Sequence, residues 1–420
     1  MISKWQWLLT KISRTLWLRA TLFALLAVIT ALIAIPAQKL INSPLPFDIG
    51  VDAVKQILNI LASSMLAVTT FSLSVMVSAY TAASSSATPR ATQLVRQDST
   101  TQNVLATFIG SFLYSLVGII ALSTDVYGEN GRLILFVVTI GVVIVIVVTM
   151  LRWIQHLSLL GRLGETTNRV EEALTNAIQQ RIDYPCLGAI ALDPDNTNIE
   201  GYYAVYPEKI GYLQHIDIGV IDRCAKSQEL EVYMLVEPGH FVHTGQAVAY
   251  YQGDSNEELN QIIIKAITIA TERSFDQDPR FGLSVMAEIA SRALSPAIND
   301  PGTAIDIISR SVRVLSLWKD HHLITDTDEK IAYSSVRLPA LQIDDLFDDI
   351  FLPISRDGAG MLEIQLRLQK SFLALKQIAP DCLTDVANHH SKIAYDRAMT
   401  SLTIESDKQR LNDLYERIHK

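Results

Sequence analysis

Four long apolar runs constrain this chain more than any other feature. They cover about residues 20–38, 57–82, 103–123 and 133–152, and their interiors hold no charged side chain. Each run is long enough for a helix that crosses a bilayer, which takes about 17 to 25 residues. Only 19% of the residues are charged, against roughly 25% in soluble domains. The sequence therefore predicts a membrane protein whose residues 1–155 form a four-helix transmembrane region.

The first run has an alternative interpretation, because a basic segment precedes it as in a secretory signal peptide. The basic residues are Lys4, Lys11, Arg14 and Arg19. The "PAQKL" that follows the run is a poor cleavage site, because cleavage favours small residues. We expect the run to remain as a membrane anchor.

The basic residues near the runs predict the orientation of the chain. Arg90 and Arg96 follow the second run, and Arg152 and Arg162 follow the fourth. With the basic N-terminus, these residues predict that the N-terminus and the C-terminal part are both cytoplasmic. If the second run lay along the interface instead of crossing, the C-terminal part would be outside.

The interiors of the runs also restrict the class of membrane protein. Proton relays, voltage sensors and ion-coupled carriers normally need ionisable residues inside the bilayer, and these runs offer none. A proton-coupled pump or a voltage sensor is therefore disfavoured. A passive pore, a carrier with a neutral lining and a simple anchor remain.

The second run carries a face of small and hydroxylated residues. At about 100° per residue, its small residues fall within a sector of about 80°; they are Ser63, Ala67, Thr70, Ser74, Ser78 and Thr81. One interpretation is a pore-lining helix, since hydroxyls wet a channel without binding ions tightly, with Ser63, Thr70, Ser74 and Ser78 as the lining residues. The other is close contact between helices, which small residues also favour.

After the fourth run the chain continues as a predicted helical stalk, residues 156–185. Its apolar stripe recurs at steps of three and four and consists of Leu160, Leu163, Thr167, Val170, Leu174 and Ala177. The stripe favours either oligomerisation through this helix or packing on the protein's own body.

Residues 200–253 are predicted to be a small β domain with several short strands and tight turns. "VEPGHFVHTGQAVA" in this segment resembles the barrel-sandwich modules of the biotinyl/lipoyl type, without the lysine hairpin that carries their prosthetic group. His240 and His243 would point to opposite faces of a strand, and a metal site needs at least three protein ligands. We therefore expect no metal and no cofactor.

Residues 255–420 are predicted to form a helical bundle. The segment "IDDLFDDIF" contains four acids, Asp344, Asp345, Asp348 and Asp349. They lack the spacing and the glycine of a Ca²⁺ loop, so a solvated start of a helix is favoured over a cation site.

The stretch "RALSPAINDPGTA" predicts an elbow between two helices of this bundle. Pro296 ends the first helix at Ser295, Asp300 caps the second, and Pro301 takes its first position. Asn299 is left to bond the preceding turn. An inter-subunit or gating contact is a second interpretation, while an anion site at the helix start is disfavoured by the charge of Asp300.

The sequence offers no chemistry that marks an enzyme. It contains no GxSxG, HExxH, P-loop or GxGxxG in the required context. Its three cysteines, Cys186, Cys224 and Cys382, form neither a disulfide framework nor a metal pair. No basic patch indicates nucleic acid. We expect a protein without catalytic activity.

The chain resembles a bacterial family of predicted membrane proteins known only as a domain of unknown function. The resemblance rests on "FGLSVMAEIASRALSPAINDPGTAID", on "TTFSLSVMVSAY" and "TPRATQLVRQD", on "VEPGHFVHTGQAVA" and on "IDDLFDDIF". It implies a multi-pass protein of the bacterial inner (plasma) membrane, with a transmembrane region followed by a cytoplasmic α+β part, a small β-barrel-like module plus a helical bundle.

Two functions are consistent with these patterns. The first is a homo-oligomeric channel-like protein whose partners are the lipid bilayer, its own copies and small ions, with the cytoplasmic part as a vestibule or gate. The alternative is a membrane-anchored cytoplasmic sensor or scaffold without transport activity.

Overall fold

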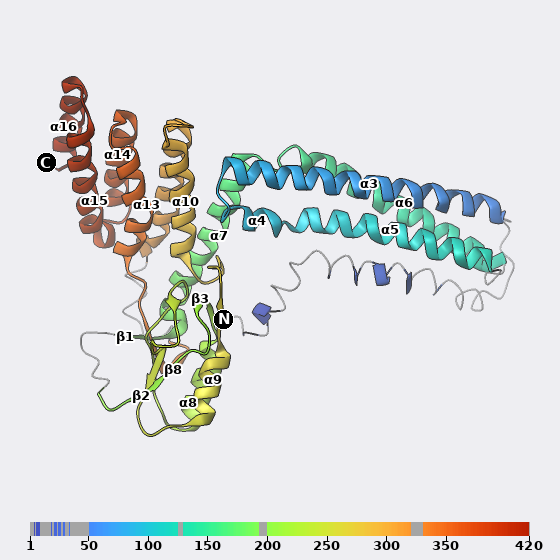
Figure 1. Cartoon of the computed structure of the whole chain (residues 1–420), viewed down its shortest axis with the longest axis horizontal. Coiled ribbons are helices and arrows are strands. Elements are labelled where there is room, and N and C mark those ends of the chain that lie inside the picture. Colours follow the sequence, from blue (N-terminus) through green and yellow to red (C-terminus); the bar gives the residue numbers. More distant parts are fainter. Residues whose placement is uncertain are drawn as a thin grey trace. The chain divides into compact units, whose positions relative to one another are not determined.

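The structure of the protein is a computed structural model in which the chain divides into two compact units. One unit is Trp7–Thr166, and the other combines Met1–Gln6 with Thr167–Lys420. Each has a hydrophobic core of its own, and Figure 1 labels many of the helices and strands along the chain. The residues that the structure describes are 50–124, 129–192, 200–320 and 331–419, with single positions between 4 and 33.

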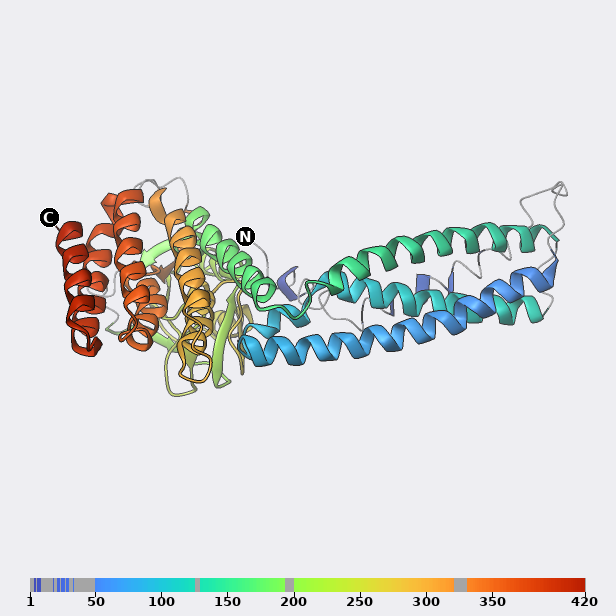
Figure 2. The ribbon, with the colours of Figure 1, turned by 90° about the horizontal axis from the view of Figure 1, so that it is seen from above.

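Among the described residues, the unit Trp7–Thr166 contains three long helices, which lie side by side in Figure 2 (blue to green). The third follows the second after a short connection, and a short helix, α4, precedes the second. The helices are α3 (Val51–Ser86), α4 (Thr92–Arg96), α5 (Ser99–Ser123) and α6 (Glu129–Leu157).

Three stretches of helix in this unit are long and apolar enough to cross a membrane: Val51–Ser86, Thr92–Ser123 and Gly131–Leu157. They contain the second, third and fourth predicted runs, which are thereby confirmed as candidate spans. The first predicted run, 20–38, lies largely outside the described residues.

Side chains from all three helices fill the core of the bundle. Tyr114 and Leu122 on α5 pack with Leu58 on α3 and Leu135 on α6, and all four side chains are at most 4% exposed. The hydroxyl group of Tyr114 bonds with that of Thr139 at 3.0 Å, so the one polar tip in this cluster has a partner, as a buried hydroxyl requires. The bundle therefore holds its helices by apolar contact and few polar bonds.

The other unit combines helices with two sheets. Its helices are α7 (Leu163–Asp183), α8 (Ile218–Ser227), α9 (Glu257–Ala266), α10 (Pro279–Leu294), α11 (Pro301–Leu315), α13 (Ile343–Asp357), α14 (Leu362–Ile378), α15 (Pro380–Ser401) and α16 (Glu405–His419). Its strands are β1 (Ala189–Leu192), β2 (Tyr203–Val205), β3 (Gly211–Ile216), β4 (Val232–Met234), β5 (Phe241–Val242), β6 (Ala249–Tyr251), β7 (Ile267–Ala270) and β8 (Tyr333–Pro339).

The strands form a mixed five-stranded sheet and an antiparallel three-stranded sheet. The five-stranded sheet has the order β1-β8-β4-β6-β2, in which β8 is parallel to both β1 and β4. The three-stranded sheet has the order β5-β3-β7. The predicted β domain of residues 200–253 is therefore too short, because β1, β7 and β8 lie outside it, and the barrel-like module is not confirmed.

Two local assignments also differ from the prediction. Ile218–Ser227, expected among short strands, is helix α8, because Asp217 accepts the backbone N–H of Val220 and caps it. The predicted helical bundle of residues 255–420 contains β7 and β8, which are held by pairing with distant strands. Pairing between distant segments overrides the local pattern at these positions.

Helix α7 packs on the protein's own body. Val170 and Leu174 of its predicted stripe are fully buried, and a Cβ placed on Gly282 of α10 would lie 2.8 Å from the Cβ of Leu174. On the polar side, Glu171 pairs with Arg310 at 2.5 Å and with Arg313 at 2.8 Å, both on α11. Val170 and Leu174 of the stripe thus pack inside the C-terminal unit, where each large apolar side chain contributes about 1.5–3 kcal/mol. These two side chains cannot also pack against a second copy of α7 in a coiled coil.

Helices α13, α14 and α15 pack around a buried histidine. His390 is 2% exposed, and its ring lies 5.5 Å from that of Phe347 and 6.4 Å from those of Phe351 and Phe372. This burial lowers the pKa of His390 to about 4, because an apolar environment disfavours the charged form.

Candidate functional site

The hydroxylated face of α3 lies opposite the face with which α3 packs into its bundle. Ser63, Thr70, Ser74 and Ser78 are all exposed. At about 100° per residue they centre about 180° from the buried positions of the helix, which include Leu58, Met65, Ser72 and Met76. The four predicted pore-lining residues therefore share one open face of this unit.

The hydroxyl groups of Ser63, Thr70 and Ser78 bond within the helix itself. Ser63 donates to the carbonyl oxygen of Asn59 at 2.9 Å, Thr70 to that of Leu66 at 3.0 Å, and Ser78 to that of Ser74 at 3.1 Å. Each hydroxyl oxygen keeps acceptor capacity directed away from its donated bond. The face is thus weakly polar and uncharged.

A polar cluster ties the start of α5 to the end of α6, and the sequence reasoning missed it. Asp98 is the N-cap of α5 and accepts the backbone N–H of Thr101 at 2.9 Å and the Thr101 hydroxyl. The same carboxylate lies 2.6 Å from Nε2 of His156 on α6. The cap motif "DSTT" was the available signal, while His156 lies 58 residues away.

This cluster continues to α3. The ring of His156 stacks on that of Trp153 at 5.9 Å between centroids, and Nε1 of Trp153 donates to the fully buried Ser72 hydroxyl at 3.0 Å. Ser72 stood outside the predicted lining sector. Polar contacts therefore join all three long helices near one end of the bundle.

The predicted elbow residues form a tight corner between α10 and α11. α10 ends at Leu294, and the backbone N–H of Asn299, which has a positive φ of 50°, donates to Ser295. Asp300 accepts the backbone N–H of Thr303 at 3.1 Å and its hydroxyl at 2.6 Å. These bonds hold the pKa of Asp300 below its usual value. Pro296 is exposed, and Pro301 takes the first position of α11.

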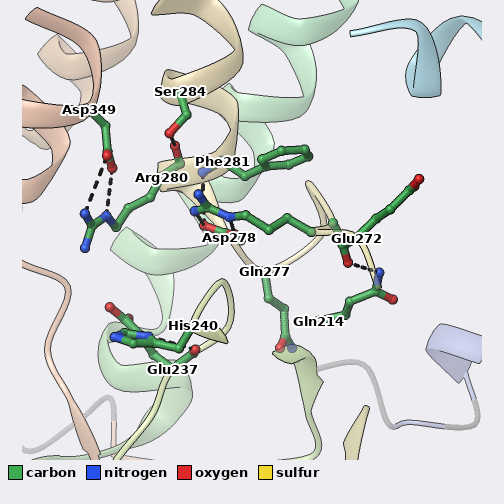
Figure 3. Close-up of polar contacts among 12 residues, drawn as sticks. Gln214, Glu237, His240, Glu272, Gln277, Asp278, Arg280, Phe281, Ser284 and Asp349 are labelled. Atoms are coloured by element: carbon green, nitrogen blue, oxygen red, sulfur yellow. Dashed lines mark hydrogen bonds and ion pairs between the residues drawn. The ribbon is translucent and has the colours of Figure 1, made fainter. Parts of the chain in front are cut away.

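A second charged region joins the β4–β5 connection to helices α7, α10 and α13; we name it the junction cluster. Figure 3 shows most of its side chains converging near the start of α10. Its members are Arg181, Glu237, Arg273, Gln277, Asp278, Arg280, Asp345 and Asp349.

Asp278 organises the centre of the junction cluster. It caps α10 by accepting the backbone N–H of Phe281 at 3.0 Å, and it binds the Arg273 guanidinium through both oxygens, at 2.7 and 2.9 Å. Gly239 comes so close that a Cβ on it would lie 2.5 Å from Asp278 Oδ2. The pair Asp278-Pro279 repeats the Asp-Pro helix start of the elbow, so the sequence already contains a signal for this cap.

Two acidic residues of α13 form ion pairs with Arg280 in the junction cluster. Arg280 pairs with Asp345 at 2.6 Å and with Asp349 at 2.7 Å. Asp349 is only 20% exposed, and burial raises its pKa despite the nearby guanidinium. No group of three or more His, Cys, Asp or Glu side chains suited to a metal ion occurs among the residues that the structure describes.

Arg181 and Glu237 are the most buried ion pair of the cluster. The Arg181 guanidinium donates through Nη2 to Glu237 at 3.2 Å and to the carbonyl oxygen of Gln277 at 3.2 Å. Its Nε and Nη1 atoms are buried with no hydrogen-bond partner among the described residues. Burial raises the pKa of Glu237. Helix α7 is thus joined to the β4–β5 connection by an ion pair in which two nitrogens of the Arg181 guanidinium lack hydrogen bonds among the described residues.

The remaining candidate side chains have local roles. His240 Nδ1 lies 3.1 Å from the carbonyl oxygen of Glu237, and His243 Nδ1 accepts the backbone N–H of Gly245 at 3.2 Å. Cys186 and Cys224 are buried free thiols, and burial raises the pKa of Cys186 to about 11. A thiol with so high a pKa is not reactive at neutral pH.

The apolar helices and the mixed unit that follows them define an integral membrane protein. The chain belongs to the family described as "Predicted membrane protein (DUF2254)", whose model matches residues 13–374. It is 33% identical over 122 residues to an uncharacterized protein of Mycobacterium bovis and, at the same identity and length, to one of Mycobacterium tuberculosis. Each match covers 28% of this chain and 23% of the relative. No solved structure matches the chain significantly.

Proposed function

We propose that the protein is a homo-oligomeric, channel-like protein of the bacterial inner membrane, with a passive pore lined by the hydroxylated face of α3. The observation that carries this proposal is the position of Ser63, Thr70, Ser74 and Ser78, exposed and opposite the buried face of α3. An assembly around a common axis would bring this face of each copy to the centre, where hydroxyls wet a passage without holding ions tightly.

The charge pattern of α3 and of the interior of α5 supports passive conduction rather than coupled transport. No charged side chain occurs between Gln56 and Thr88, a segment that includes most of α3, and the interior of α5 has none. The Asp98–His156 pair lies at the start of α5 and near the end of α6. A coupled carrier would normally need such groups to bind protons or ions inside the bilayer. In this proposal the C-terminal unit is cytoplasmic and acts as a vestibule or gate, the protein needs no cofactor, and it is not an enzyme.

The experiment is single-channel recording in planar bilayers with the full-length protein. Ser74→Leu is expected to lower the unitary conductance, because it places a bulky apolar side chain on the lining face. Leu73→Ile is the matched control, since Leu73 is exposed, adjacent and about 100° away around the helix, and it should leave conductance unchanged. A wild-type assembly that never conducts, or equal conductance in the two variants, contradicts the proposal.

A membrane-anchored sensor or scaffold is the alternative function. The C-terminal unit has an extensive hydrophobic core of its own, as a separately folded sensor or scaffold domain would. An intact homo-oligomer without conductance, with a C-terminal unit that binds a soluble partner, would support this alternative.

A further inference from the structure

Lys4, near the N-terminal end of the chain, contacts distant residues of the C-terminal unit. Its backbone N–H donates to Asp217 Oδ2 at 2.5 Å. Its ammonium group donates to the carbonyl oxygen of Ile267 at 2.8 Å and to that of Lys265. These partners lie more than 200 residues further along the chain, so this is a long-range contact within the unit that combines Met1–Gln6 with Thr167–Lys420.

The acceptors suit a cation at this place. Lys265 lies in the last turn of α9, and Ile267 is its C-cap. The final carbonyl groups of a helix lack partners within the helix and carry the negative end of its dipole. An ammonium group that bonds two of these oxygens therefore satisfies them and is stabilised by the dipole.

Asp217 holds the other half of the contact. Its Oδ1 accepts the backbone N–H of Val220 and caps α8, while its Oδ2 accepts from Lys4. One carboxylate thus joins the start of α8 to the N-terminal segment. Burial lowers the pKa of the Lys4 ammonium, and the nearby Asp217 carboxylate acts in the opposite direction.

We propose that the corner between α8 and α9 is a docking site for the chain's own N-terminus, which holds both ends of the membrane region on the same side of the bilayer. Two points on one side are separated by an even number of crossings. The candidate spans α3, α5 and α6 give three. The predicted run at residues 20–38 then supplies the fourth crossing, and α3 crosses the bilayer instead of lying along its surface.

The first test places a reporter that is active only in the cytoplasm at either end of the full-length chain. We expect activity from both fusions. Activity from one end only would overturn the proposal, because it requires an odd number of crossings. Glycosylation or export reporters at the same two positions give the reciprocal readout and should both be silent.

The second test measures the docking contact in the full-length protein. Amine labelling of the wild-type protein in membranes is followed residue by residue by mass spectrometry. Lys226 is the control, because its side chain is 49% exposed. We expect Lys4 to react several-fold more slowly than Lys226, since its ammonium group donates to two backbone carbonyl oxygens. Equal rates for the two lysines would overturn the docking site even if both ends share one side.

Discussion

Replacement of Gly239 by alanine should destabilise the C-terminal unit. Gly239 has a φ of +103°, a conformation that alanine adopts at a cost of about 1–3 kcal/mol. Its new Cβ would also lie 2.5 Å from Asp278 Oδ2, so Asp278 must move. That movement breaks the N-cap of α10, which contributes about 1 kcal/mol to stability, and weakens the hydrogen bonds to Arg273, which contribute about 2 kcal/mol.

Gly253 provides a control that separates these two effects. Its φ is +109°, so Gly253→Ala carries a similar backbone strain, but no atom lies within 4 Å of the added Cβ. The difference between the two variants therefore reports the collision with Asp278 alone, about 3 kcal/mol by the sum of the cap and the ion pair. For a unit of this size, that difference corresponds to a gap of about 6 to 12 °C in melting temperature.

The measurement is thermal unfolding of the full-length variants in one detergent, followed by intrinsic fluorescence at a single scan rate. A fixed rate matters because large proteins often unfold irreversibly and their apparent melting temperature then depends on heating rate. Melting temperatures for Gly239→Ala and Gly253→Ala that agree within about 2 °C would refute the role given to Asp278 as the centre of the junction cluster.

Three further predictions concern other parts of the molecule. The pKa of His390 is about 4, against a usual 6.5, so the unfolded chain takes up a proton before the folded chain as pH falls. The free energy of unfolding should therefore decline by about 3 kcal/mol between pH 6.5 and pH 4. Acid denaturation of the His390→Phe variant should lack this decline. Trp153→Phe removes the bond to Ser72 and should lower bundle stability by about 1 kcal/mol, measured by the denaturant midpoint. Gly282→Val should lower the melting temperature sharply, because Leu174 leaves no room for a side chain, whereas Gly164→Val, with open space around it, should change it little.

The sequence was sufficient where the determining forces are local. An uncharged apolar run predicts a membrane helix because every backbone group must be satisfied within the segment, and α3, α5 and α6 follow that rule. The corner between α10 and α11 was also predictable, since a proline and a capping aspartate act within a few residues.

Features that depend on distant partners could not be predicted. β8 looks like a short polar stretch in a helical region, and only its pairing with β1 and β4 makes it a strand. Arg181 lies in the predicted stalk beyond its apolar stripe, yet its side chain is buried beside Glu237. His156 lies just beyond an apolar run, and its role comes from Asp98 at the start of another helix.

The place of β8 in its sheet also has a consequence for synthesis. β8 lies between β1 and β4, but the ribosome makes it about 80 residues after β6, a delay of about 4 to 16 s at 5 to 20 residues per second. During that interval the facing edges of β1 and β4 have no partner, while the apolar helices have already left the ribosome. We therefore expect nascent chains that end before Tyr333 to be held by chaperones, and this sheet to close only after membrane insertion has begun.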